Sequence, residues 1–252
     1  MAKSVLVRVA LLCLLAPAVA HAQSTSRPAG GRIFISVNGL GQAGDGDVIE
    51  QSHSSVVYDE PATATATQQP AFPNGLFDIG AGFRTNQFGV GVAFTAAGTG
   101  SGTAVAVTSI PHPFLVNRPR NVVTEIDDME HKERAVHIQA YYFMPVDDKF
   151  ELGFFVGPSF YNVKQDYVTG LGTFSETSNP SVVTVSLGKA TASDSQVGYN
   201  IGAEGTYSFT PNVGAAVLLR FTRASVDLDF GGQETTMNVG DIQFGAGLRF
   251  RF

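Results

Sequence analysis

The chain has 252 residues, and its 22 Asp and Glu residues outnumber its 16 Lys and Arg residues, for a net charge of −6. An acidic chain of this kind lacks the clustered positive charge that nucleic-acid binding requires. A single cysteine excludes a disulfide framework within the chain. Hydrophobic residues make up 44% of the sequence, so the fold has to place a large apolar surface.

Residues 1–22 have the three parts of a secretory signal peptide. Two positive charges precede an apolar run over residues 9–20, which is shorter than the roughly 20 residues of a membrane-spanning helix. Ala20 and Ala22 put small residues at the two positions that a signal peptidase reads, which predicts cleavage before Gln23. The cysteine lies in the apolar run, so cleavage would leave no thiol in the mature chain. A flexible linker is expected over residues 23–30, followed by a single domain over residues 31–252.

The dominant pattern from residue 31 onward has a period of two, which places alternate side chains on opposite faces of a strand. Residues 241–252 are the clearest case, because apolar side chains ending at Phe252 alternate with polar or small ones. Residues 77–84, 88–95 and 196–209 repeat the scheme. Alternation disperses apolar residues without any long apolar run, as in a transmembrane β-barrel. The sequence therefore predicts an all-β fold, a closed antiparallel up-and-down transmembrane β-barrel.

Three connections between the predicted strands are short, at residues 84–87, 145–149 and 210–212. Aromatic residues crowd around these connections and the C-terminus: Phe83, Phe88, Tyr142, Phe143, Phe150, Tyr207, Phe209, Phe250 and Phe252. If the short connections share one end of the barrel, their aromatic residues form a girdle at one lipid–water boundary. Short turns are expected on the periplasmic side, and long loops outside.

This arrangement predicts eight membrane-crossing strands and four long outer loops. The strands are residues 31–41, 75–84, 88–98, 132–144, 150–163, 195–209, 212–227 and 237–252, and the loops are residues 42–74, 99–131, 164–194 and 228–236. Residues 54–67 and 101–110 also resemble strands, so ten strands are the alternative. Eight are preferred because ten would move the turn at Thr85 and Asn86 to the outer side, away from the other two short turns.

Polar and charged side chains on the opposite strand faces are expected to point into the barrel. The predicted interior network consists of Asp78, Arg84, His137, Gln139, Glu151, Glu204, Arg220, Arg249 and Arg251. Side chains just fill an eight-stranded barrel, and an unpaired buried charge is very costly. The set therefore predicts a plug of ion pairs. A path that conducts protons or ions along the same residues is the alternative.

The closing segment, residues 240–252, looks like the terminal signal that the outer-membrane assembly machinery recognises, with Phe244, Leu248, Phe250 and Phe252 on one face. Together with the Gly-rich residues 88–94 and the turn pattern, the chain resembles small outer-membrane barrels of the OmpA/OmpX/OmpW type. The resemblance implies the outer membrane of a Gram-negative-type bacterium, with membrane lipids, lipopolysaccharide and the assembly machinery as partners. It also implies roles in envelope integrity, adhesion or passage of small apolar molecules. No periplasmic peptidoglycan-binding domain is expected after Phe252.

No catalytic, cofactor or metal motif stands out. His53 is expected in a loop without a positioned base, His112 in a rigid Pro-His-Pro turn, and His131 and His137 beside a charged stretch. The spacing of these histidines does not match the serine and histidine sites of lipid-modifying barrel enzymes. The glycines at positions 89 and 91 lack the strand–turn–helix context of a nucleotide site.

Two acidic segments are candidates for divalent-cation bridging to lipopolysaccharide. Asp45, Asp47 and Glu50 lack the full carboxylate ladder of a calcium loop. Residues 125–130 contain four carboxylates just before Lys132, and the alternative for both segments is a solvated loop near the membrane rim.

The sequence thus favours a non-enzymatic integral outer-membrane protein, structural or surface-interacting through its long loops and without a cofactor. The alternatives are a narrow channel for small or apolar solutes and a lipid-modifying barrel enzyme.

Overall fold

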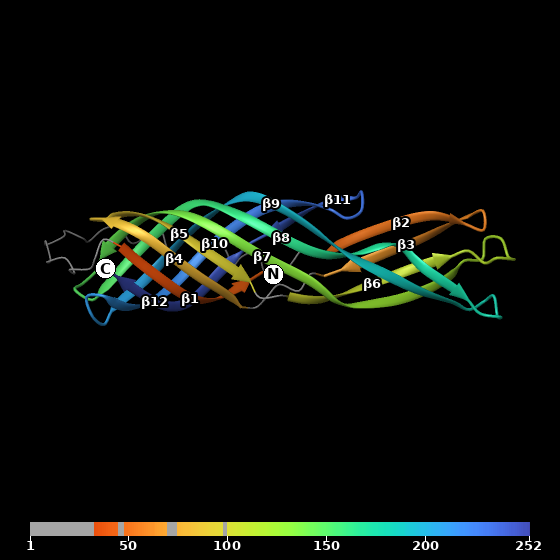
Figure 1. The fold of residues 1–252 in the computed structure, drawn as a ribbon, viewed down its shortest axis with the longest axis horizontal. Helices are drawn as coiled ribbons and strands as arrows, with labels where there is room; N and C mark the ends of the chain where they lie inside the picture. Colours follow the sequence, from red (N-terminus) through yellow and green to blue (C-terminus); the bar gives the residue numbers. More distant parts are fainter. Residues whose placement is uncertain (1–32, 45–47, 70–74, 98–99) are drawn as a thin grey trace, which may run out of the picture.

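The computed structural model describes residues 33–44, 48–69, 75–97 and 100–252. The predicted signal peptide, its cleavage site and the linker lie outside these residues. The described residues contain no helix that is long and apolar enough to cross a membrane. They form twelve strands in an elongated molecule, with a ring of strands at one end and a narrower sheet at the other (Figure 1).

Eight strands close into an antiparallel ring. In ring order they are β1 (Ile33–Ala43), β4 (Leu76–Thr85), β5 (Phe88–Ala97), β7 (Arg120–Pro145), β8 (Phe150–Glu176), β9 (Val183–Ser208), β10 (Val213–Asp229) and β12 (Ile242–Arg251). The ring closes at β1, where Ile35 pairs with Ala81 of β4 on one side and with Phe250 of β12 on the other. The prediction of eight strands is confirmed.

The segments predicted as long outer loops are mostly strands. They form β2 (Ile49–Val57), β3 (Glu60–Gln68), β6 (Gly100–Ile110) and β11 (Glu234–Val239), and they lengthen β7, β8 and β9 to 26, 27 and 26 residues. β2 pairs with β3, β3 with β6, and β6 with residues 120–131 of β7. We call this sheet, completed by residues 164–176 of β8 and 183–194 of β9, the extension. The ten-strand alternative is wrong, because residues 54–67 and 101–110 pair outside the ring.

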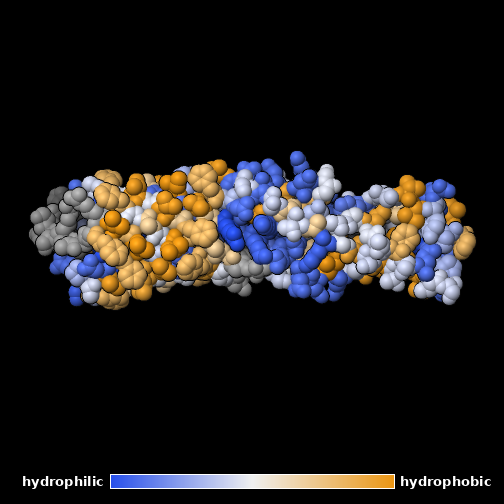
Figure 2. Space-filling model, in the orientation of Figure 1, coloured by the Kyte–Doolittle hydropathy of each residue, from blue (hydrophilic) through white to orange (hydrophobic). Residues whose placement is uncertain are grey.

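Alternation sorts the side chains of the ring strands between its outside and its interior. On β5, for example, Val90, Val92 and Phe94 are exposed, whereas Ala93 and Thr95 are buried. The outward apolar side chains form a belt around the ring, and a hydrophilic band lies between this belt and the extension (Figure 2). The belt is the surface that fits the hydrocarbon of a bilayer.

One aromatic residue does not join the girdle predicted around the short turns. Tyr142 is exposed, but Phe143 is buried inside the ring and stacks on Tyr141 with ring centroids 5.3 Å apart. The prediction for Phe143 was wrong because successive residues of a strand point to opposite faces, whatever their distance from a turn.

Two apolar clusters lie inside the molecule. One includes Phe34, Phe143 and Phe155, at the end of the ring that carries the short turns. The other includes Val226, Phe230 and other buried side chains towards the extension. The extension has its own narrow core, in which Ala66, Ala104 and Ala106 pack with Met129 and Val168.

Candidate functional site in the barrel interior

All nine polar residues of the network predicted from the sequence sit on inward faces of ring strands. Eight are buried, and Arg84 is partly buried: Asp78 and Arg84 lie on β4, His137 and Gln139 on β7, Glu151 on β8, Glu204 on β9, Arg220 on β10, and Arg249 and Arg251 on β12. The strands thus bring together side chains from all parts of the described chain. The structure arranges these side chains in two layers.

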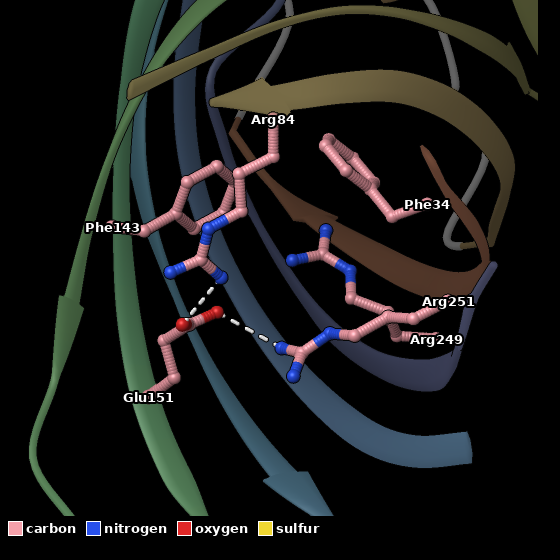
Figure 3. Close-up of a pocket in the computed structure, with 6 residues that line it drawn as sticks. All are labelled: Phe34, Arg84, Phe143, Glu151, Arg249 and Arg251. Atoms are coloured by element: carbon pink, nitrogen blue, oxygen red, sulfur yellow. Dashed lines mark hydrogen bonds and ion pairs between the residues drawn. The ribbon is translucent and has the colours of Figure 1, made fainter. Parts of the chain in front are cut away.

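The layer nearest the short turns is centred on Glu151. One oxygen of its carboxylate lies 2.5 Å from Arg84 Nη1, and the other lies 2.9 Å from Arg251 Nη2 (Figure 3). The Arg84 guanidinium also lies over the Phe143 ring, 4.5 Å from its centroid. One buried carboxylate therefore joins β8 to β4 and β12 across the barrel.

Arg249 forms the second ion pair of this layer. Its two terminal nitrogens contact the two carboxylate oxygens of Glu204, with Nη2 2.6 Å from Oε2. The guanidinium lies over the Phe34 ring, 4.6 Å from its centroid. A bidentate contact of this kind fixes the orientation of both side chains.

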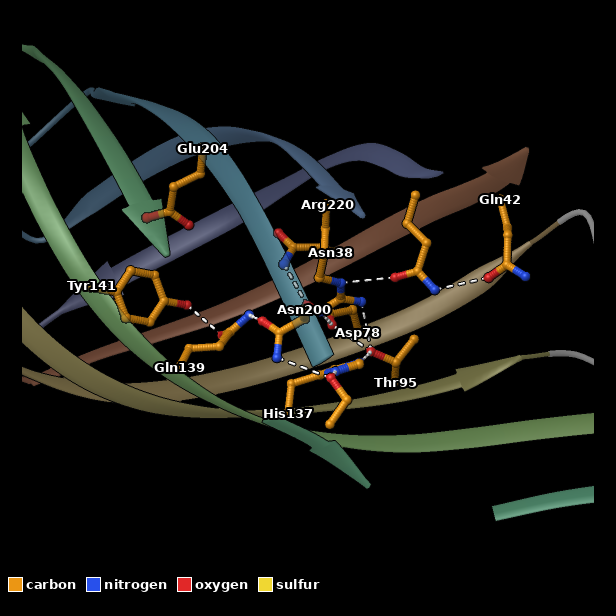
Figure 4. A network of polar contacts seen from close by, with 12 residues as sticks. Asn38, Gln42, Asp78, Thr95, His137, Gln139, Tyr141, Asn200, Glu204 and Arg220 are labelled. Atoms are coloured by element: carbon orange, nitrogen blue, oxygen red, sulfur yellow. Dashed lines mark hydrogen bonds and ion pairs between the residues drawn. The ribbon is translucent and has the colours of Figure 1, made fainter. Parts of the chain in front are cut away.

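The second layer is centred on the buried carboxylate of Asp78. Arg220 Nη1 lies 3.0 Å from Oδ2, Thr95 Oγ1 donates to the same oxygen at 2.8 Å, and Asn38 Nδ2 donates to Oδ1 at 2.9 Å (Figure 4). Arg220 also donates from Nη2 to Thr95 Oγ1 and from Nε to Gln243, at 2.8 Å each. The carboxylate is therefore both ion-paired and hydrogen-bonded, as a stable buried charge requires.

A chain of neutral groups continues from this cluster. His137 Nε2 lies 3.1 Å from Thr95 Oγ1, and His137 Nδ1 lies 2.7 Å from Ser159 Oγ. Because the Thr95 hydroxyl donates its only proton to Asp78, Nε2 of His137 donates to Thr95. His137 is fully buried and its hydrogen bonds go to hydroxyl groups, so a charged imidazole would lack a counter-charge. The ring is therefore assigned as neutral, with Nδ1 accepting from Ser159, and its role is structural.

Further along, Tyr141 donates to Gln139 at 2.7 Å and Gln139 donates to Asn200 at 3.2 Å. Sequence reasoning missed Asn38, Thr95, Tyr141 and Ser159 as members of the network, although the same alternation places them on inward faces. These four residues were missed because an uncharged side chain on an inward face does not by itself require a buried partner, whereas an ionised one does.

Two small cavities border the network. One lies among Phe34, Arg84 and Arg249 and the other lies between Thr95 and Tyr161, each with a volume of about 10 Å³. A cavity of this size holds at most about one water molecule. Neither space could take a hydrated ion or a solute.

The structure places the other candidate groups as follows. Among the described residues, no three His, Cys, Asp or Glu side chains are placed to hold a metal ion. Asp45 and Asp47 lie outside the described residues, and residues 125–130 belong to β7, not to a loop. His53 was also expected in a loop but lies in β2. His131 contacts Gln165 at 2.7 Å and Glu133 at 2.9 Å, all three buried.

Several known outer-membrane proteins are similar to this chain. The sequence matches the family described as "Outer membrane protein beta-barrel domain" over residues 9–250. No curated protein matches the chain. Among solved structures, Neisserial surface protein A is 14% identical with a TM-score of 0.46, covering 88% of this chain and 99% of its own. The N-terminal β-barrel domain of Pseudomonas aeruginosa OprF is 12% identical with a TM-score of 0.40, and its coverages are 88% and 99%. The outer membrane protease OmpT from Escherichia coli is 11% identical with a TM-score of 0.42, and its coverages are 87% and 96%.

Proposed function

The chain belongs to the outer membrane protein β-barrel domain family, and from this premise we propose that it is a non-enzymatic surface protein of the bacterial outer membrane. Its barrel is a sealed anchor, and its extension is the part that meets other molecules outside the cell. The observation that carries the proposal is the filled interior. Ion pairs centred on Asp78, Glu151 and Glu204 cross the barrel and leave cavities of only about 10 Å³ beside them.

The construction of the extension supports a display role. β7, β8 and β9 each run from the ring into the extension as one strand, and the pairing of β8 with β9 continues into the extension with one register shift between Thr169 and Thr173. At 26 or 27 residues these strands are much longer than the 9–11 residues that cross a bilayer. The surplus length holds the far end of the extension well clear of the membrane.

The far end, which we call the tip, consists of the turns between β2 and β3, between β6 and β7, and between β8 and β9, together with the end of β2 at Val56 and Val57. It exposes six large apolar side chains, each between 46% and 78% accessible: Val56, Tyr58, Phe114, Leu115, Val116 and Val182. Figure 2 shows hydrophobic residues at this end of the molecule. Exposed apolar groups gathered at one place mark an interaction surface in a soluble environment.

Polar contacts tie the three turns of the tip to one another. The Glu60 carboxylate accepts from the Asn117 backbone N–H at 3.0 Å, which joins the first turn to the second. Arg120 donates to the Pro111 carbonyl at 2.6 Å and to the Pro180 carbonyl at 2.8 Å, and it pairs with Glu176 at 2.6 Å. These contacts join the second turn to the third, so the apolar side chains are presented on a fixed support.

Planar-bilayer conductance of the refolded protein tests the sealed barrel. We expect no steady open current at neutral pH, because ion pairs cross the interior and the two cavities described beside them are too small for a hydrated ion. A narrow channel would instead show a steady current that changes when Glu151 is replaced by Gln. That result would reject the anchor and favour the channel.

The surface role is tested by displaying the protein on a Gram-negative host and measuring attachment to cultured eukaryotic cells and to apolar surfaces. The triple substitution Phe114→Ser, Leu115→Ser and Val116→Ser should abolish most of the attachment. Val123→Ser, which changes an exposed apolar residue of β7 outside the tip, is the matched control. Equal attachment by both variants would show that the tip is not the interaction surface.

A further inference from the structure

Two lysines face each other on the outer surface just beyond the apolar belt. Lys132 of β7 and Lys164 of β8 are directly opposite partners in the antiparallel ladder. Their neighbours Glu133 and Val163 are buried, so both lysines point outward. Like charges in directly opposed positions repel each other and destabilise a sheet. Arg134 is exposed on the same face, one outward position closer to the belt, and adds a third positive charge.

Nearby carboxylates compensate only part of this positive charge. Lys132 Nζ lies 2.5 Å from Glu130, and Lys189 Nζ lies 3.7 Å from Asp166. Within the described part of the chain, no carboxylate forms an ion pair with Lys164 or Arg134. The patch therefore keeps two uncompensated positive charges, on a protein whose net charge is −6.

The position of the patch relative to the belt points to its ligand. The next outward residue after Arg134 is Val136, which pairs with Phe160, and both are exposed apolar residues of the belt. On the other side, Lys132 and Lys164 line an open surface cavity of about 270 Å³ with Glu130, Asp166 and Thr191. The three cationic side chains therefore lie at the interface between the hydrocarbon and the headgroups of the lipid.

We propose that Lys132, Lys164 and Arg134 bind a phosphate group of lipid A, the phosphorylated glycolipid of the outer leaflet. A phosphate bound between the opposed lysines would reduce their repulsion, and its charge-assisted hydrogen bonds would compensate Lys164 and Arg134. The acyl chains of the same molecule would cover Val136 and Phe160. This inference rests on the outer-membrane location and is independent of the sealed interior and of the tip.

The first test measures the lipid A that stays bound to the purified barrel in mild detergent, by native mass spectrometry. Lys132→Gln with Lys164→Gln should reduce retention several-fold, and Lys164→Arg should preserve it. Lys149→Gln is the matched control, since Lys149 is an exposed lysine in a short turn at the opposite end. Heat-modified mobility on gels checks that each variant is folded. Unchanged retention in the double variant, or equal loss in the control, would overturn the site.

Two further arms identify the chemistry of the ligand. Dephosphorylated lipid A should be retained poorly by the wild type, and its full retention would reject phosphate recognition. Binding of inorganic phosphate alone, dependent on the same lysines but without lipid A retention, would reject the lipid assignment.

A further test compares the effect of Lys164→Gln on the stability of the barrel in two kinds of bilayer, where we expect changes of opposite sign. In phosphatidylcholine, Lys164→Gln should be neutral or stabilising, because it removes a repulsion. In bilayers that contain lipid A, the same substitution should destabilise the barrel. The same sign in both bilayers would count against the proposal.

Discussion

Arg220 and Asp78 are separated by 142 residues in the sequence, yet Arg220 Nη1 lies 3.0 Å from Asp78 Oδ2. Their strands, β10 and β4, are not neighbours in the ring, since β12 and β1 lie between them. Their side chains are only 1% and 3% exposed. The ion pair therefore crosses the interior of the barrel and links two parts of its wall that share no backbone hydrogen bond.

Removing one partner of this pair should be strongly destabilising. Arg220→Met leaves the Asp78 carboxylate buried without its counter-charge, which costs about 3–5 kcal/mol. The double variant Arg220→Met with Asp78→Leu should lose less stability than Arg220→Met alone. Urea unfolding in lipid vesicles measures the difference, with Arg223→Met on the outer face of β10 as the control. A loss in the control as large as in Arg220→Met would mean that the buried pair is not the cause.

The close contact between β7 and β8 at Gly157 should make replacement of this glycine destabilising. The pairing of these strands is interrupted between His137 and Ala140 without a change of register, and a Cβ at Gly157 would overlap the backbone carbonyl of Ile138. Gly157→Ala should therefore cost about 1–3 kcal/mol through overpacking. Gly39→Ala is the matched control on β1, because an added Cβ there meets nothing within 4 Å. Unfolding midpoints in the same lipid compare the two, and equal midpoints would contradict the steric reason.

The C-terminal residue should matter more for assembly than for stability. Phe252 is exposed on the outer face, and its backbone exchanges hydrogen bonds of 2.9 and 3.3 Å with Ile33. Its side chain contributes roughly 1.5–3 kcal/mol by burial in lipid, small beside a barrel whose backbone is hydrogen-bonded throughout. If residues 244–252 carry an assembly signal, deleting Phe252 should lower the amount of protein in the outer membrane sharply. Undiminished amounts would show that these residues are ordinary strand sequence.

A positive charge introduced at two positions of β12 should cost different amounts of stability, because the two positions lie at different depths in the membrane. Phe244→Arg places a cation within the belt and should cost about 2–4 kcal/mol, whereas Phe252→Arg near the interface should cost about 0–1 kcal/mol. Both side chains are exposed on the outer face, so neither substitution disturbs the interior. Refolding equilibria of the two variants in vesicles give the comparison. A larger cost for Phe252→Arg than for Phe244→Arg would mean that Phe244 does not lie within the hydrocarbon of the membrane.

The turn between β7 and β8 should respond to acid. The backbone N–H groups of Lys149 and Phe150 each donate to Asp147 Oδ1 at 2.7 Å, and these bonds hold the pKa of Asp147 below its ordinary value of 3.8. A carboxyl whose pKa is lowered on folding stabilises the protein above its unfolded pKa, and the contribution disappears as pH falls through the folded pKa. The stability difference between wild type and Asp147→Ala should therefore be present at neutral pH and should shrink below about pH 4. Asp148→Ala is the control, and a difference that grows in acid would contradict the assignment.

The sequence by itself predicted which side chains of the ring strands face inward, because a period of two depends only on the backbone of each strand. It did not determine the number of strands: eight were preferred over ten because the three short turns resemble one another, and only the strand pairing of the structure decided the number. The same rule, applied to Tyr142 and Phe143, places Phe143 inside the ring. The girdle prediction was wrong for Phe143 because it assigned residues by their distance from a turn and not by the face of the strand on which they lie.

Partners across the barrel were decided only by the tertiary structure. Alternation shows that Arg220 and Asp78 point inward, but their contact depends on the order and register of strands far apart in the chain. The same holds for Lys132 opposite Lys164 and for the three turns that meet at the tip. Residues 49–68 and 100–110 join the extension and not the ring because they pair with each other and with β7. Local periodicity carries no information about such pairing, since it is a property of two segments together.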